Sequence, residues 1–129
     1  MKALTIKQPF ANLIVSGFKD VENRTWPTKR RERIYIHASQ SKEYISNIPK
    51  AVNKKQFDSL PGNEQYQLTH GIWVWSAIIG EVEIIDCVRN SDSVWALPDN
   101  WHWILANPVK YRNPILNVKG KLSFWEYTL

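Results

Sequence analysis

Residues 78–88 read Ile-Ile-Gly-Glu-Val-Glu-Ile-Ile-Asp-Cys-Val, and they overlap the longest extended signal in the chain, which runs from Ile72 to Cys87. From Gly80 onward, Val82 and Ile84 alternate with two glutamates, as in a strand with one buried face and one face in water. A glycine inside such a run is typical of a bulge or a bend, as at the corner of a barrel. The stretch therefore predicts a long strand that bends within a curved sheet.

Shorter extended segments flank this strand, together with one early helix. The extended segments are residues 3–6, 21–26, 33–39, 101–109 and 122–127. Between the first two, Pro9 suits the first turn of a helix and Gly17 suits its C-terminal end. Many short strands without β-α-β alternation predict a mainly β (α+β) fold, a small closed or half-closed β-barrel with peripheral helices.

The length of 129 residues fits a single domain that covers residues 1–129. Residues 40–71 differ from the rest because polar and basic residues dominate, and Pro49, Pro61 and Gly62 break the pattern. We interpret this segment as a basic insertion on the outside of the domain, with one or two short helices. Its basic run, Lys50, Lys54 and Lys55, is more typical of a solvated face than of a binding patch.

The composition argues for a globular protein that does not enter a membrane. Apolar residues make up 43% and charged residues 22%. The longest apolar stretch, residues 72–80, is far shorter than the roughly 20 residues of a membrane span. No signal-peptide pattern opens the chain, and its only cysteine, Cys87, excludes an intrachain disulfide and a cysteine-built zinc site. We expect a soluble, cytoplasmic protein without a metal site or a cofactor.

The charge is unevenly distributed along the chain. Residues 1–60 hold 12 Lys and Arg against 5 Asp and Glu, a net of +7, whereas residues 61–129 hold 5 against 7, a net of −2. A positive field of this kind favours a phosphate-bearing partner. Seven tryptophans are typical of an aromatic core, although tryptophan also stacks on bases. These features favour RNA or a nucleotide as the partner and leave a protein partner open.

Polar residues gather between residues 7 and 39, among short apolar anchors, as in a binding site. The sharpest constellation is Lys19, Glu22 and Arg24, where a desolvated lysine beside a carboxylate can serve as a base and the arginine can grip a phosphate. The alternative is an internal ion-pair network that holds the loop. In a regular strand Lys19 would point away from the other two. We therefore predict a bend between residues 17 and 21 that turns all three, with Lys7, into one hollow.

Other candidate ligand-binding residues each have a structural alternative. Lys7 and Gln8 precede the helix, where they either bind an anion or cap the helix start. His37 lies opposite the buried face of its strand and is either a cleft residue, with Ser39, or a hydrogen-bonded structural histidine. Lys119 precedes a glycine that permits close backbone approach, and it is a further candidate for the cleft.

A dense positive run, Arg30, Arg31 and Arg33, either follows a phosphate backbone or forms a solvated hairpin tip. Trp26 either stacks on a base or belongs to the core. The sequence contains no Ser-His-Asp signature, no P-loop and no dinucleotide fingerprint, which disfavours the commonest triad and nucleotide-triphosphate chemistries.

Four blocks of sequence stand out together. They read LTIKQPFANLIVSGFKDVENRTW (4–26), IYIHAS (34–39), IIGEVEIIDCV (78–88) and WHWILANPV…NVKGKLSFWEY (101–127). This pattern resembles the ASCH domain (activating signal cointegrator homology), a member of the PUA-like superfamily. The first block is the most specific, and residues 40–71 are the least covered. The resemblance implies a PUA-like β-barrel with a cleft lined by the helix start, the Lys-x-x-Glu-x-Arg segment and the strand that carries the histidine.

The same resemblance carries implications for function. ASCH domains look like RNA-binding modules linked to RNA metabolism or transcription co-activation. At least one small bacterial member hydrolyses the acetyl amide of acetylated cytidine, and nuclease activity is described for another. On the amidohydrolase pattern, Lys19 matches a catalytic lysine that follows a glycine, whereas Glu22 replaces a threonine. The later catalytic glutamate of that pattern has no secure counterpart in this sequence, and Glu81 and Glu83 match it only loosely.

Three functions follow from these observations. The leading hypothesis is an RNA- or nucleotide-binding ASCH domain whose basic cleft meets phosphates through Lys7, Lys19, Arg24 and Arg30–Arg33. In it, a base lies beside Gln8, Glu22 and Trp26. The alternative is a small hydrolase of a modified nucleoside (N(4)-acetylcytidine amidohydrolase-like) or a ribonuclease, with Lys19 and Glu22 as an acid/base pair. A third is a protein-interaction module whose aromatic second half docks a partner.

Overall fold

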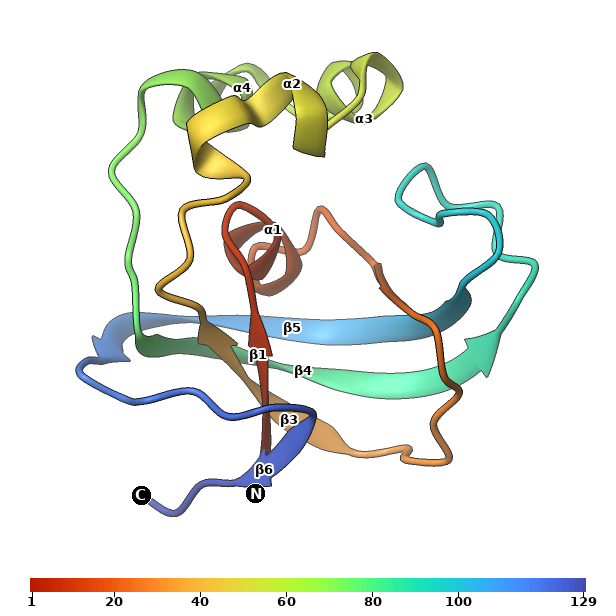
Figure 1. Ribbon diagram of the computed structural model, residues 1–129, viewed down its shortest axis with the longest axis vertical. Coiled ribbons are helices and arrows are strands. Elements are labelled where there is room, and N and C mark those ends of the chain that lie inside the picture. Colours follow the sequence, from red (N-terminus) through yellow and green to blue (C-terminus); the bar gives the residue numbers. More distant parts are fainter.

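The computed structural model describes all 129 residues, and its six strands form one sheet (Figure 1). The strands are β1 (Lys2–Ile6), β2 (Val21–Arg24), β3 (Arg33–Ala38), β4 (Ala77–Val88), β5 (Trp101–Ile115) and β6 (Phe124–Glu126). Their order in the sheet is β2-β5-β4-β3-β1-β6, and every pair is antiparallel except the parallel pair of β1 and β3. The sheet curls into a half-barrel, which confirms the predicted mainly β, PUA-like fold class.

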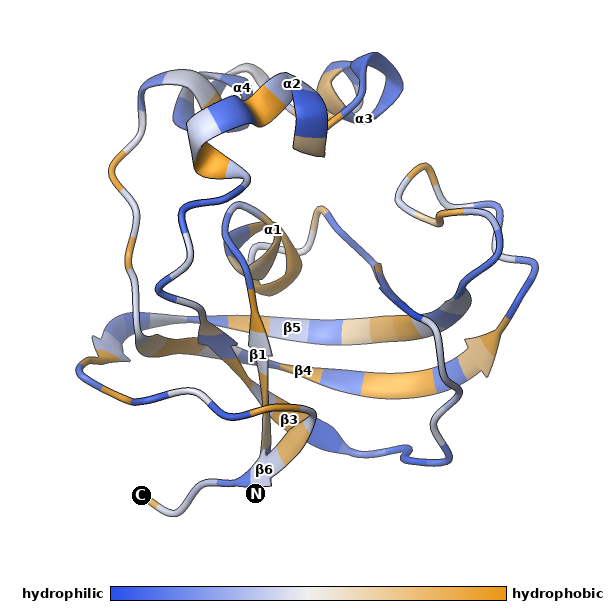
Figure 2. Cartoon of the chain, viewed as in Figure 1, coloured by the Kyte–Doolittle hydropathy of each residue, from blue (hydrophilic) through white to orange (hydrophobic).

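The curl brings together strands from opposite ends of the sheet order. Trp103 of β5 stacks on Phe124 of the edge strand β6, with ring centroids 5.3 Å apart and planes only 8° from parallel. Along β4, Glu81 and Glu83 alternate with the buried Val82 and Ile84, as the sequence predicts, and the ribbon of Figure 2 shows apolar and polar positions along this strand. Val82 and Ile84 join residues of β1, β3, β5 and the first helix in a main core of 14 buried residues.

The first helix, α1 (Phe10–Val15), packs into the hollow of the sheet and ends at Gly17, whose φ of 86° explains the predicted stop. Gly80 permits this packing. A Cβ at Gly80 would lie 2.2 Å from the carbonyl oxygen of Val109 on β5 and 2.7 Å from Cγ1 of Val15 on α1. The β4–β5 register also shifts beside Gly80, so the predicted bulge is present.

The strand β5 is longer than the sequence predicts. The sequence predicts an extended segment over residues 101–109, yet the strand continues to Ile115. Pro108 and Pro114 lie where the register between β4 and β5 shifts. Proline is tolerated at such interruptions because the ladder needs no N–H donor there. The two prolines therefore interrupt the strand without ending it.

Residues 40–71 form more helix than predicted. A 3-10 turn (η1, Ile45–Asn47) precedes α2 (Ile48–Ala51), α3 (Lys54–Asp58) and α4 (Gly62–His70), and Figure 1 shows these helices stacked beyond α1, away from the sheet. Their apolar side chains form a second core with Leu13 of α1 and with Trp95. The side chains of Lys50, Lys54 and Lys55 are exposed, as expected. None of the helices in the chain has the length and apolar content needed to cross a membrane.

One prediction about β3 is wrong, because both of its faces are buried. Tyr35 is 7% exposed and His37 only 1% exposed. The chain returns along β1 as β6, and its Trp125 packs over this second face, edge-on to His37 at 5.6 Å. The two chain ends meet there, since the N-terminal ammonium lies 2.7 Å from Oε1 of Glu126. Tyrosine and histidine carry polar atoms, so their alternation with the apolar residues of β3 is also the pattern of a strand with one solvent-exposed face.

Candidate functional site

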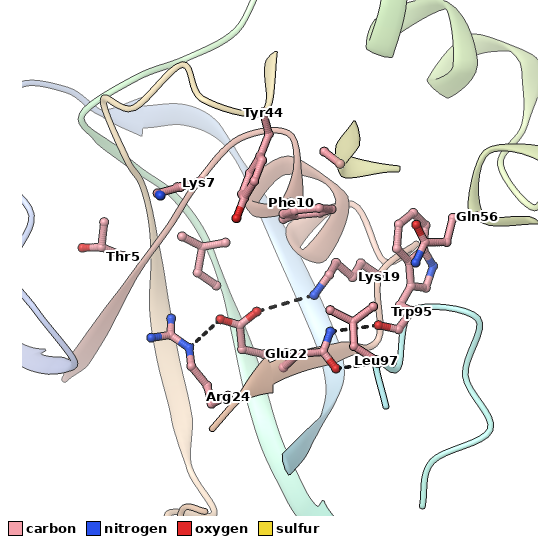
Figure 3. Close-up of a pocket in the computed structure, with 13 residues that line it drawn as sticks. Thr5, Lys7, Phe10, Lys19, Glu22, Arg24, Tyr44, Gln56, Trp95 and Leu97 are labelled. Carbon is pink, nitrogen blue, oxygen red and sulfur yellow. Dashed lines mark hydrogen bonds and ion pairs between the residues drawn. The ribbon is translucent and has the colours of Figure 1, made fainter. Parts of the chain in front are cut away.

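A cavity of about 380 Å³ opens between α1, β2 and the helical segment (Figure 3). It draws side chains from the end of β1, from α1, from β2, from the segment 44–56 and from the loop that follows β4. The residues that line it are Thr5, Ile6, Lys7, Phe10, Lys19, Glu22, Asn23, Arg24, Tyr44, Ala51, Gln56, Trp95 and Leu97. The structure therefore places Lys7, Lys19, Glu22 and Arg24 around one hollow, in the arrangement that the sequence predicts.

The predicted bend after α1 produces this convergence. Gly17 turns the chain in the left-handed region, and the N–H groups of Phe18 and Lys19 both donate to the carbonyl of Leu13, at 2.9 and 3.0 Å. The turn directs Lys19 toward β2, where Val21 begins the strand. As a result, the lysine faces the same cavity as the side chains of the strand, although a straight extended chain would separate them.

A charged cluster forms the floor of the cavity. Nζ of Lys19 lies 3.5 Å from Oε1 of Glu22 and also donates to the carbonyl of Val21, and Nε of Arg24 donates to Oε2 of Glu22 at 2.8 Å (Figure 3). The side chain of Lys19 is 5% exposed, and this burial lowers the pKa of Lys19 below its ordinary value. One carboxylate thus pairs with two cationic side chains, so the cluster keeps a net positive charge when Lys19 is protonated.

The cluster leaves one set of donors unused. Each carboxylate oxygen of Glu22 is held by a cation, so the carboxylate joins Lys19 to Arg24. The guanidinium of Arg24 uses only Nε, and its two terminal nitrogens have no hydrogen-bond partner in the protein. In Figure 3 these nitrogens point toward Thr5, away from the carboxylate. They can receive an anion in the paired geometry that guanidinium offers to phosphate.

The walls of the cavity combine aromatic rings with amides that are already bonded. Phe10 and Tyr44 meet edge-to-face at 5.3 Å, and both rings are only partly buried. Asn23 donates to the carbonyl of Trp95 and accepts from Leu97, so its amide is fully used. Gln56 is likewise bound, through the carbonyl of Val94 and the N–H of Asn53. The rings, and the hydroxyl of Tyr44, are the wall groups that a ligand can contact.

Lys7 lies at the rim, where it forms an exposed ion pair. Its Nζ is 2.5 Å from Oε2 of Glu43, and this hydrogen bond raises the pKa of Lys7 and lowers that of Glu43. The same ammonium lies 5.4 Å from the ring centroid of Tyr44. Exposed ion pairs are weak, so a phosphate can displace the carboxylate. Lys7 is therefore a rim cation that a ligand can recruit.

Two predicted binding residues lie elsewhere. Gln8 is 1% exposed and does not line the cavity, because Oε1 accepts from the N–H of Asn12 and Nε2 donates to the carbonyl of Val74. The alternative given for this residue, a structural role at the helix start, describes it correctly. Trp26 also lies outside the lining. Its ring is 41% exposed and packs against the guanidinium of Arg24 at 5.3 Å, so it orients the arginine.

The predicted arginine run also lies outside the cavity, and each member is paired with a carboxylate. Arg30 pairs with Glu32 at 3.0 Å, Arg31 with Asp86 at 3.9 Å and Arg33 with Glu81 at 2.8 Å.

Glu81 and Glu83, which the amidohydrolase pattern suggested, form hydrogen bonds within the protein in the same region. Besides its arginine, Glu81 binds the hydroxyl of Tyr111, and Glu83 accepts from Asn107. Neither glutamate lines the cavity, so the fold does not bring either of them beside Lys19.

The remaining candidates, His37, Ser39 and Lys119, line a second cavity of about 550 Å³. Thr5 lines both cavities, so the two hollows adjoin.

The sequence did not indicate Tyr44 and Gln56 as residues of the first cavity, because they lie in the segment interpreted as an outside insertion. The pattern Asn53-x-x-Gln56 is a capping box that starts α3, and it could have indicated an ordered helix with a buried glutamine.

A half-barrel with one helix in its hollow and a charged, aromatic cavity beside that helix is a small, mainly β domain of the PUA-like type. Sequence comparison gives the family. Residues 4–115 match the ASCH domain, and the chain belongs to the ASCH domain family.

The chain is similar to activating signal cointegrator 1 from two mammals. It is 31% identical to the Homo sapiens protein over 103 residues, which is 74% of this chain and 16% of the relative. It is 30% identical to the Mus musculus protein over 141 aligned positions, which cover 95% of this chain and 22% of the relative. The chain thus spans about a fifth of the length of these relatives.

Proposed function

We propose that this ASCH domain binds single-stranded RNA, or a nucleotide within it, in the cavity beside α1. The role would lie in RNA metabolism or transcription-related regulation in the cytoplasm. Its family and its similarity to a protein named activating signal cointegrator 1 support a role of this kind. The observation that carries the proposal is the guanidinium of Arg24, whose terminal nitrogens are free beside the aromatic walls of a cavity.

The geometry suits a nucleotide in two respects. The cavity volume of about 380 Å³ falls within the roughly 300–1,000 Å³ of small-molecule sites. The rings of Phe10 and Tyr44 offer apolar surface to a base, while Arg24 and Lys7 offer charge to its phosphate. Arg24 is also held in place, because Glu22 binds its Nε and Trp26 packs on its plane. Such preorganisation limits the conformational entropy lost on binding.

The proposal is tested by the affinity of the purified protein for a fluorescent RNA hexanucleotide and for nucleoside monophosphates. We expect Arg24→Gln to weaken binding of both about tenfold, because a charged hydrogen bond is lost. The matched control is Arg112→Gln, which alters an exposed arginine that has no ion pair. Unchanged affinity in Arg24→Gln would contradict the proposal. Affinity that is insensitive to salt would instead favour the third function, a protein-docking module.

A second candidate function, hydrolysis of a modified nucleoside, rests on Lys19. A buried lysine whose pKa is lowered by desolvation, and which lines a cavity, can act as a base or nucleophile more readily than an exposed lysine. Glu22 would then position Lys19 through their ion pair. Release of acetate from N(4)-acetylcytidine by the wild type, lost in Lys19→Met, would establish this function. The same assay with short RNA tests the ribonuclease alternative.

A further inference from the structure

The second cavity differs from the first in its lining. Its volume is about 550 Å³, and no Phe, Tyr or Trp side chain lines it. The side chains that face it are instead hydroxyls, amides and ammonium groups, contributed by Ser39, Gln40, Ser76, Asn117, Lys119 and Lys121. The ring that does line it, the imidazole of His37, has both nitrogens bonded within the protein, so the cavity lacks the large aromatic surface on which bases stack. Its groups are donors of the kind that contact phosphate and sugar oxygens.

The wall of this cavity is fixed by a chain of buried hydrogen bonds. Nε2 of His37 lies 2.6 Å from the carbonyl of Val118 and must donate to it, so in the neutral ring Nδ1 accepts from the hydroxyl of Thr5 at 3.1 Å. The same hydroxyl accepts from Nε1 of Trp125 at 3.2 Å. Both ring nitrogens are therefore used, and His37 orders the loop without facing a ligand itself.

Two further contacts hold the loop 117–122 in place. The N–H of Val118 donates to the carbonyl of Ser76 at 2.8 Å. A Cβ at Gly120 would lie 2.8 Å from Oγ1 of Thr5 and 2.9 Å from Cε1 of His37, so the backbone packs directly on this pair. The cavity is therefore formed before any ligand arrives.

The lysines of this loop carry charge that nothing in the protein neutralises. Lys119 and Lys121 are exposed, and neither has a carboxylate within ion-pair distance. No acidic residue lines the cavity. By contrast, the arginine run, the floor of the first cavity and Lys7 are all paired with carboxylates. The loop is thus an uncompensated positive site in an ordered, polar hollow, which attracts anions.

We propose that the second cavity binds the backbone phosphates of the nucleotides next to the one held in the first cavity, so that a single RNA strand crosses between the cavities at Thr5. This inference rests on the proposed function. The strand presents a base and its phosphate to the aromatic cavity, and its neighbouring phosphates to Lys119 and Lys121. The first cavity then selects the nucleotide, and the second adds affinity that depends on strand length.

The test is a double variant, Lys119→Gln with Lys121→Gln, compared with wild type on the RNA hexanucleotide and on the four nucleoside monophosphates. We expect hexanucleotide affinity to fall about tenfold. The slope of log affinity against log salt should become shallower by about 1.4, or about 0.7 for each phosphate on the single strand that a lysine no longer neutralises. Affinity for the monophosphates should not change. Lys50→Gln with Lys55→Gln, which alters two exposed lysines outside both cavities, is the matched control.

The outcomes separate the two proposals. If the double variant keeps the affinity and the salt slope of the wild type while Arg24→Gln still weakens monophosphate binding, the second cavity is not a phosphate site and the proposed function stands. If the double variant weakens hexanucleotide binding but Arg24→Gln changes nothing, no strand joins the cavities and both proposals fail. Thermal unfolding midpoints equal to that of the wild type establish that the surface variants are folded.

Discussion

The two cavities share Thr5 but hold their charges differently. In the first, Lys19 and Arg24 are fixed by Glu22, and the amides of the wall are bonded within the protein. In the second, the backbone is fixed while the lysines that line it are free. Charged side chains that are already fixed lose little conformational entropy when a ligand binds, so they favour discrimination between ligands. Charged side chains that are free attract anions over a longer range, and salt weakens this attraction. One small domain can thus separate selectivity from affinity.

The largest expected effect comes from removing the anion of the first cavity. Glu22→Gln leaves the buried Lys19 and the partly buried Arg24 without a counter-charge, so we expect the free energy of unfolding to fall by about 3 kcal/mol. Denaturation with urea measures this change. Lys19→Met is the comparison, and we expect a smaller loss because Glu22 keeps its arginine. Equal losses in the two variants would show that charge balance does not stabilise the cluster.

A smaller loss is expected where the loop of the second cavity packs on its support. Gly120→Val should cost about 1–3 kcal/mol of stability, since its side chain meets Thr5 and His37 at contact distances that require the loop to move. Hexanucleotide affinity should fall with it, while monophosphate binding persists. Gly62→Ala is the control, because a Cβ at that position meets no atom within 4 Å. Wild-type hexanucleotide affinity in Gly120→Val would argue against a preformed second cavity.

Acid should loosen the same wall. Burial lowers the pKa of His37 below its ordinary value, so the unfolded chain takes up a proton at a higher pH than the folded one does. The stability that neutral His37 contributes is therefore present above about pH 6.5 and is lost as the pH falls toward its folded pKa. Unfolding midpoints measured between about pH 8 and about pH 5 should fall less in His37→Gln than in the wild type. Parallel profiles would exclude His37 as the source.

The smallest effect is expected at the rim of the first cavity. Glu43→Gln releases Lys7 from its exposed ion pair, so we expect RNA affinity to rise slightly, mainly through faster association at low salt. Stability should hardly change, because both side chains lie in water. Stopped-flow association rates at two salt concentrations provide the measurement. A decrease in affinity would mean that Glu43 itself contributes to the site.

The sequence predicted what depends on neighbouring residues. Alternation located β3 and β4, and the glycine at position 80 marked the bulge because no side chain fits there. The floor of the first cavity was predictable because Lys19, Glu22 and Arg24 lie within six positions and a single turn brings them together.

What the sequence did not predict depends on residues far apart in the chain. The second face of β3 is covered by Trp125, about 90 positions away, and no local pattern announces that contact. The walls of the first cavity need Tyr44 and Trp95, which come from separate loops. The arginine run looked like a free patch because its partners lie on other strands or point back along the chain. Only the folded structure shows that each of these arginines is paired with a carboxylate.

The antiparallel pairing of β1 with β6 has a mechanical consequence. Lys2 pairs with Glu126 and Leu4 with Phe124, so both chain ends leave the sheet at the same side (Figure 1). A pulling force applied to the two ends would open this short ladder one bond at a time, as a zipper opens, instead of shearing all of its bonds together. Peeling β6 away would also withdraw Phe124 from Trp103. Tension along the chain would thus separate β6 from β1, and Phe124 from Trp103, before it disrupted the other strand pairs of the sheet.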